Sequence, residues 1–187
     1  MPMTYAANLE DIRFVLFEQL AVDQELSTIE RYADFDVDTY NAILEEAARI
    51  ASEVLSPINA SGDREGCKLD VSTGSVTTPQ GFKHAWKVIA EGGWISPTAS
   101  PDFGGVGMPA AMGMATVEMF IAANMAFEMY PGLTAAAARV IALHAPEQWR
   151  QPYAEALFTG RWGGTMCLTE AGAGSGADDL VAIRPSE

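Results

Sequence analysis

The chain has 187 residues, of which 49% are hydrophobic, and its formal net charge is -14, from 25 acidic and 11 basic residues. This length and apolar content predict a folded domain with a core rather than a disordered chain. The acidic charge argues against binding to bare nucleic acid or to an anionic membrane surface, because both need a basic face.

Two helices are predicted in the first third of the chain. Residues 8–21 carry apolar side chains at helical spacing, including Ile12 and Leu16. A longer helix is expected to begin within residues 34–38, where aspartates can cap it. Because proline cannot continue a helix, this second helix is expected to end just before Pro57.

A surface loop and a third helix are predicted next. Residues 59–77 are polar and rich in turn formers, which favours a loop with at most a short strand or hairpin around residues 69–76. Thr78 can then cap a helix that has Pro79 at its first position. The pair Gly92-Gly93 is expected to end this helix.

Three further helices and one strand are predicted in the second half. A loop over residues 96–109 precedes a helix rich in Ala and Met to about residue 130. Pro131-Gly132 is expected to break it and to start another helix to about residue 144. An amphipathic helix over residues 147–159 then leads to a strand at 162–169. Six helices followed by a strand indicate an α+β protein or a helical domain leading into a β domain.

Cysteine content and the first residues indicate the cellular compartment. Cys67 and Cys167 form no spaced framework, so we expect two free buried thiols, although one disulfide between them is possible. Residues 1–10 lack the basic and apolar blocks of a signal peptide. No apolar run reaches the ~18 residues that a membrane span needs. These features predict a cytoplasmic protein without a membrane span.

Several short motifs favour ordinary structural interpretations. Residues 172–177 match the dinucleotide fingerprint G-x-G-x-x-A, but the ten residues that follow cannot hold a βαβ unit. Asp102-Phe103-Gly104 matches the kinase magnesium motif without a catalytic loop before it, so a tight loop is expected there. His84 and His144 lack the spacing of a zinc site, and we expect no metal. The methionines of residues 108–129 favour a core face over a ligand pocket.

The chain resembles the acyl-CoA dehydrogenase family at three places. Cys167-Leu-Thr-Glu-Ala-Gly-Ala-Gly-Ser175 is similar to the family's flavin signature, and Pro101-Asp-Phe-Gly-Gly-Val-Gly-Met-Pro109 is similar to one of its loops. The helix that ends in Gly160-Arg-Trp162 also matches. Residues 5–20 resemble the N-terminal extension of bacterial members related to 3-methylmercaptopropionyl-CoA dehydrogenase. The similarity covers essentially the whole chain.

The resemblance implies a mostly α fold: a helical N-terminal domain over residues 1–160, followed at 161–187 by the first strand of a truncated β domain. It implies an FAD enzyme that dehydrogenates an acyl-CoA between its α and β carbons. Ser175 would also contact the acyl-CoA. A homo-oligomer or a chain that supplies the missing domains is the implied protein partner. The implied cofactor-binding residues are Met166, Cys167, Leu168, Thr169, Gly174 and Ser175.

The chain also departs from the family pattern. Ala171 replaces the family's proline, and Gly176 stands where an aspartate is expected. The family's base, which removes the α-proton, would lie beyond residue 187, so no catalytic residue is implied here and the chain alone is expected to be inactive. Two alternatives are a non-catalytic subunit that completes an FAD or acyl-CoA site with a partner chain, and an inert fragment. The lone strand is expected to dock on the helices, pair with another chain or be disordered.

Overall fold

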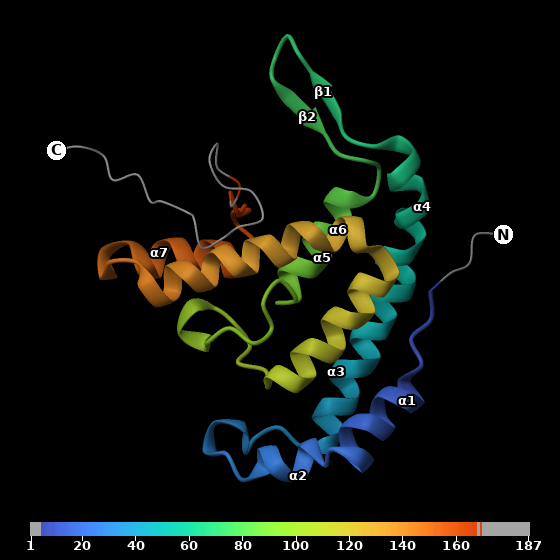
Figure 1. The fold of residues 1–187 in the computed structure, drawn as a ribbon, viewed down its shortest axis with the longest axis vertical. Helices are drawn as coiled ribbons and strands as arrows, with labels where there is room; N and C mark the ends of the chain where they lie inside the picture. The colour runs from blue at the N-terminus through green and yellow to red at the C-terminus, as the bar shows by residue number, and fades with distance from the viewer. Residues whose placement is uncertain (1–4, 168, 170–187) are drawn as a thin grey trace.

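The fold is built on two long helical segments that pack against each other (Figure 1). The computed structural model describes residues 5–167 and 169. One segment joins α3 (Val37–Ile50), the π-helical turn η3 (Ala51–Leu55) and α4 (Ser56–Glu65), and the other is α6 (Ala110–His144). Their apolar faces meet in the main core, where Leu44 is fully buried. The predicted mostly α class is confirmed.

The first helices lie at the foot of α3 (Figure 1). The helix predicted over 8–21 is present as an α-helical turn followed by a π-helical one, and Leu16 is buried. Asn8 caps its start through a side-chain oxygen that accepts from the Asp11 amide at 3.4 Å. Two short helices complete this region before α3 begins. The elements are α1 (Leu9–Arg13), η1 (Phe14–Gln19), α2 (Val22–Ser27) and η2 (Glu30–Tyr32).

The start of α3 was predicted correctly, whereas its end was not. Asp36 is the cap, with its carboxylate accepting from the Thr39 amide at 2.7 Å. The helical path does not stop before Pro57 but continues to the end of α4. The reason is the wide turn of η3, in which the Ser56 amide bonds to the carbonyl of Ala51. Pro57 thereby enters the first turn of α4, where its missing N–H is not needed.

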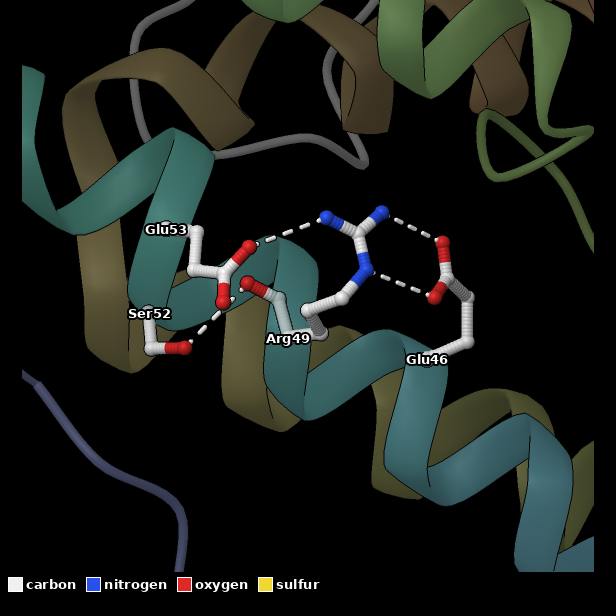
Figure 2. A network of polar contacts seen from close by, with 4 residues as sticks. All are labelled: Glu46, Arg49, Ser52 and Glu53. Atoms are coloured by element: carbon white, nitrogen blue, oxygen red, sulfur yellow. Dashed lines mark hydrogen bonds and ion pairs between the residues drawn. The ribbon is translucent and has the colours of Figure 1, made fainter.

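An exposed polar network lies along the junction of α3 and η3 (Figure 2). Arg49 forms ion pairs with Glu46 at 2.7 Å and with Glu53 at 3.1 Å. The Ser52 hydroxyl donates to the Arg49 carbonyl at 3.2 Å. Because these side chains are exposed, each pair contributes only about 0.3–0.5 kcal/mol. The network therefore supports the helical path on its outer side, while the buried face supplies most of the stability.

A hairpin projects away from the helices near the predicted residues 69–76 (Figure 1). The loop predicted over 59–77 begins later than expected, because residues 59–65 belong to α4. Strands β1 (Lys68–Asp70) and β2 (Ser75–Thr77) pair antiparallel, with Leu69 opposite Val76. Cys67 lies just before this hairpin and is free but exposed. Cys167 is also free and exposed. The expectation of buried thiols was therefore wrong, because both cysteines lie in segments that the core does not cover.

Helix α5 (Phe82–Glu91) starts later than the sequence suggested. Thr78 does not cap it. Instead, the chain turns after Pro79, whose carbonyl accepts from the Phe82 amide at 3.2 Å, and Gly81 precedes the helix with φ +91°. Glycine adopts this left-handed conformation without the strain that a side chain would add. The helix ends at Gly92-Gly93 as predicted.

Helix α6 bends sharply, but not at the predicted position. The predicted break at Pro131-Gly132 was wrong, since both residues lie inside the helix. The break occurs at Asn124, where φ is -159° and ψ is 83°, and it divides α6 into a first arm (110–123) and a second arm (125–144). The buried Asn124 caps the second arm by accepting from the Phe127 amide at 3.0 Å, and it donates to the Leu55 carbonyl at 3.1 Å. A tertiary contact therefore fixes the bend.

Length and composition alone would let α6 cross a membrane, contrary to the expectation from the sequence. Within this fold, however, α6 is a core helix: Met112, Met119 and Phe120 are fully buried against neighbouring helices. The break at Asn124 also interrupts the straight path that a span requires. Packing inside the protein therefore accounts for the apolar residues on the buried face of α6.

Helix α7 (Glu147–Phe158) confirms the helix predicted over 147–159 and packs along the second arm of α6 (Figure 1). Ala156 and Leu157 of the predicted apolar face are buried. Trp149 and Tyr153, which belong to the same predicted face, remain partly exposed. The rings of Tyr153 and Trp162 lie 5.3 Å apart, edge to face.

Candidate functional site

The segment that carries the flavin-like motif docks on the helices after α7. Gly160, with φ +72°, ends the helix, and the Trp162 amide donates to the Ala156 carbonyl at 2.9 Å. The Gly164 amide donates to the Thr134 hydroxyl of α6 at 3.0 Å. Of the three outcomes expected for this segment, its described residues show docking on the helices. The expectation of a strand over 162–169 was wrong for its described residues, because their hydrogen bonds go to groups of α6 and α7 instead of a neighbouring strand.

Two glycines allow this segment to approach α6 closely. A Cβ on Gly163 would overlap the hydroxyl of Tyr130. A Cβ on Gly164 would lie 2.9 Å from the Cβ of Ala137, closer than such atoms pack. The glycine pair therefore positions the residues that follow it against the second arm.

Beyond the docked glycines, the chain forms one wall of an apolar cavity of about 350 Å3. Thr165, Met166 and Cys167 line one side. The opposite side belongs to α6, which contributes Ala137, Val140 and Ile141. Among the described residues, no group accepts a hydrogen bond from the amides of 165–167. We refer to this feature as the motif cavity.

The described cofactor candidates fall into two groups. Met166 and Cys167 lie together in the motif cavity, and Met166 is 51% exposed, so its side chain is available for contact. Thr169 is exposed and does not line that cavity. Leu168, Gly174 and Ser175 lie outside the described residues.

The loop between α5 and α6 is closed by its own backbone. The Gly107 amide bonds to the Ala99 carbonyl at 2.8 Å, and the Met108 amide bonds to the Pro97 carbonyl at 2.9 Å. Within it, the motif Asp102-Phe103-Gly104 follows Ser100 in the short helix η4 (Pro101–Phe103) and its C-terminal glycine. The tight-loop interpretation of this motif is confirmed.

This loop lies in the angle between the two arms of α6, where it encloses a cavity of about 220 Å3. Glu128 of the second arm lines this cavity and is only 7% exposed. Its Oε2 atom has no hydrogen-bond partner among the described residues. Burial raises the pKa of Glu128 to about 7. We call this feature the Glu128 cavity.

Sequence reasoning did not single out Glu128. Its burial follows from the bend of α6 and from the loop over it, which local patterns do not reveal. The available signal was an acidic residue within the long run of Ala, Met and aromatic residues that forms α6. Acidic residues are rarely fully buried unless they are paired, so this signal did not by itself predict the burial of Glu128.

Other candidates receive simpler explanations. His84 and His144 are both exposed, and the described part of the chain contains no group of three metal-ligating side chains. The methionines of residues 108–129 are divided: Met108, Met112 and Met119 are buried in the core, whereas Met114, Met125 and Met129 are exposed. The predicted core face is therefore confirmed for the first three only. Met114, which is 68% exposed, lines the Glu128 cavity.

Comparison with known proteins gives one consistent result. The family model for the acyl-CoA dehydrogenase N-terminal domain matches residues 37–161. The chain is 35% identical over 182 residues to a 3-methylmercaptopropionyl-CoA dehydrogenase of Ruegeria pomeroyi, covering 97% of the chain and 30% of that relative. It is 36% identical to a broad-specificity linear acyl-CoA dehydrogenase of Mycobacterium tuberculosis, with 98% and 30% covered.

A third relative gives the same picture. The chain is 34% identical to a butyryl-CoA dehydrogenase of Syntrophomonas wolfei, covering 91% of the chain and 28% of that protein. The chain therefore spans about 30% of the length of these relatives.

Proposed function

This chain belongs to the acyl-CoA dehydrogenase family, and from that membership we propose that it supplies one wall of a site for FAD-dependent α,β-dehydrogenation of an acyl-CoA thioester. The observation that carries the proposal is the motif cavity. It combines residues of the flavin-like motif, Met166 and Cys167, with an apolar face of α6. The hydrogen bond between Gly164 and Thr134 holds the two walls together.

The described residues fit a flavin. An aromatic ring system needs an apolar face to pack on, and Val140 and Ile141 provide one. The ring edge needs hydrogen-bond donors, and the amides of 165–167 have no acceptor among the described residues. The chemistry that FAD supplies when bound is acceptance of a hydride from the β carbon. We propose that the cofactor is held by Met166, Cys167, Leu168, Thr169, Gly174 and Ser175.

The roles of these residues follow from their chemistry. Backbone amides near Met166 would donate to the polar edge of the flavin and stabilise the negative charge that hydride transfer brings. The hydroxyl of Ser175 would donate to a phosphate or to the thioester oxygen of the acyl-CoA.

The dehydrogenation also needs a base to remove the α-proton. Among the described residues, no carboxylate or histidine lines the motif cavity. Glu128 lines a different cavity, formed with the loop before α6. We therefore propose that the chain alone does not turn over and that the base comes from a part of the family architecture outside these 187 residues. A cytoplasmic location and a homo-oligomer remain predictions.

A non-catalytic assembly role is the second candidate. It is favoured by apolar side chains exposed on the motif segment: Met166 lines the motif cavity and Trp162 lies three residues before its lining begins, and both are about half exposed. A partner segment that covered them would complete the site. In that case the chain would bind FAD only together with its partner.

The isolated chain offers a direct test. We expect that purified protein, given FAD, an acyl-CoA and an artificial electron acceptor, shows no turnover, because the base is missing. Visible flavin absorbance that co-elutes with the chain would exclude the inert-fragment alternative. Turnover by the isolated chain would contradict the proposal that it lacks the base.

A further inference from the structure

Glu128 presents a carboxyl group that the rest of the described chain leaves unused. The residue is only 7% exposed, and its Oε2 atom has no hydrogen-bond partner among the described residues. A buried polar group without a partner destabilises the fold, and the cost is larger when the group is charged. A carboxyl is therefore held here at an energetic cost, on a residue that lines an open volume.

The volume it faces exceeds the needs of one water molecule. The Glu128 cavity measures about 220 Å3. A water molecule occupies roughly 30 Å3 in the liquid. Most of the wall is apolar or small, and it includes Ile95, Pro97, Val117 and Ala135. Such a wall suits a short hydrocarbon stem.

Charge in the cavity is unevenly distributed. Glu128 is the acidic residue in its lining, and Arg139 is the basic one. Both lie on the second arm of α6, eleven residues apart, which corresponds to roughly 16 Å along a helix. No ion pair joins them among the described residues. The part of the cavity near Glu128 is therefore left without a cation, whereas the part near Arg139 already has one.

We propose that the Glu128 cavity binds a primary ammonium group on a short apolar stem, with the ammonium at the carboxylate and the stem against the apolar wall. An ammonium donates up to three hydrogen bonds and supplies the missing countercharge. The hydroxyl of Ser96, which also lines the cavity and is buried, can accept one of them. The proposal rests on residues 95–139 and is independent of the dehydrogenase function.

Three probes of equal stem length test the proposal on the full chain. Butylammonium, butanol and butyrate are titrated by calorimetry or ligand-observed NMR at about pH 8, where a carboxyl with a pKa of about 7 is mostly ionised. We expect butylammonium to bind at least about tenfold more tightly than butanol, because only it supplies a countercharge. Butyrate should bind most weakly.

Two variants separate the charge of the site from its space. Glu128→Gln keeps the shape and is expected to lower butylammonium affinity to that of butanol. Gly132→Leu keeps the carboxyl but adds a side chain where a Cβ meets no atom within 4 Å, on the cavity wall, and should weaken both probes. Circular dichroism and melting confirm that each variant folds.

Three results would overturn the proposal: equal binding of the three probes, no binding of butylammonium, or a preference for butylammonium that survives Glu128→Gln. None of the probes contains coenzyme A or requires flavin. Failure here would therefore leave the dehydrogenase proposal intact, and failure of that proposal would leave this one intact.

Discussion

Buried polar side chains on the second arm of α6 and at its bend carry most of the chemistry at the residue scale. Thr134 is fully buried and satisfied, because it donates to the Tyr130 carbonyl at 2.8 Å and accepts from the Gly164 amide. Glu128, six residues earlier in the same arm, is buried and has no partner for Oε2 among the described residues. The first residue anchors the motif segment, whereas the second lines the cavity for which we propose a ligand.

The raised pKa of Glu128 predicts how stability depends on pH. Below about pH 4.5 the carboxyl is protonated in both the folded and the unfolded chain and contributes nothing. Between 4.5 and about 7 the unfolded chain releases the proton while the folded chain keeps it, so the free energy of unfolding falls as the pH rises. Above that range the loss is constant, at about 3 kcal/mol.

Replacement of Glu128 by glutamine should remove this loss. We expect Glu128→Gln to match the wild type near pH 4 and to exceed its free energy of unfolding by about 2–3 kcal/mol at pH 8. Urea unfolding across this pH range measures the difference. Met129→Gln introduces the same amide at an exposed neighbour and should keep the wild-type pH dependence. Parallel pH curves for wild type and Glu128→Gln would refute the assignment.

At the element scale, the bend of α6 depends on one side chain. Asn124 ties the start of the second arm to the end of η3, through the Phe127 amide and the Leu55 carbonyl. Because Phe127 and Leu55 are both buried, water cannot replace the hydrogen bonds that their backbone groups would lose with the Asn124 side chain. The angle between the arms, which contains the loop and the Glu128 cavity, therefore depends on this residue.

Asn124→Ala tests this dependence. We expect the free energy of unfolding to fall by about 2–4 kcal/mol, from the lost cap and the unpaired Leu55 carbonyl. Asn8→Ala is the matched control, because Asn8 also caps a helix, α1, but through an exposed hydrogen bond of 3.4 Å. We expect this variant to lose less than about 1 kcal/mol of the free energy of unfolding. Chemical denaturation measures both. Equal losses for the two variants would contradict the role given to Asn124.

Local signals were sufficient for some elements and insufficient for others. Asp36 predicted the start of α3 as its cap residue. The apolar period of residues 147–158 predicted α7. Both signals could be read from the sequence because capping and periodicity involve residues only a few positions apart. The passage through Pro57 depends on the wide turn of η3, which places the proline in the first turn of α4. The bend at Asn124 depends on a hydrogen bond to Leu55, 69 residues away, which no local pattern contains. The breaks predicted at proline were therefore wrong at both Pro57 and Pro131.

The candidate site was predictable to a similar degree. Met166 and Cys167 were named from the motif, and the structure brings both to one cavity. The α6 residues that complete it were not named, because docking of the segment depends on close contacts of Gly163 and Gly164. Glu128 was missed because only the assembled fold buries it.

At the scale of the whole molecule, the described chain is a set of packed helices that presents a partly open apolar cavity, for which we propose a flavin. Its family is established by a match over residues 37–161 and by relatives of which it spans about 30%. The motif cavity has one apolar wall from α6 and one wall from the motif segment. Met166 in its lining and Trp162 on the same segment are exposed, and we propose that further parts of the family architecture cover them.

A chimera tests the central claim most directly. Residues 1–187 replace the matching segment of the Ruegeria pomeroyi relative, and the purified protein is assayed for flavin absorbance and for dehydrogenation of its acyl-CoA substrate. We predict that the chimera retains FAD and turns over, because the motif cavity completes the flavin site once the remaining domains are present. A folded chimera that contains no FAD would contradict the account.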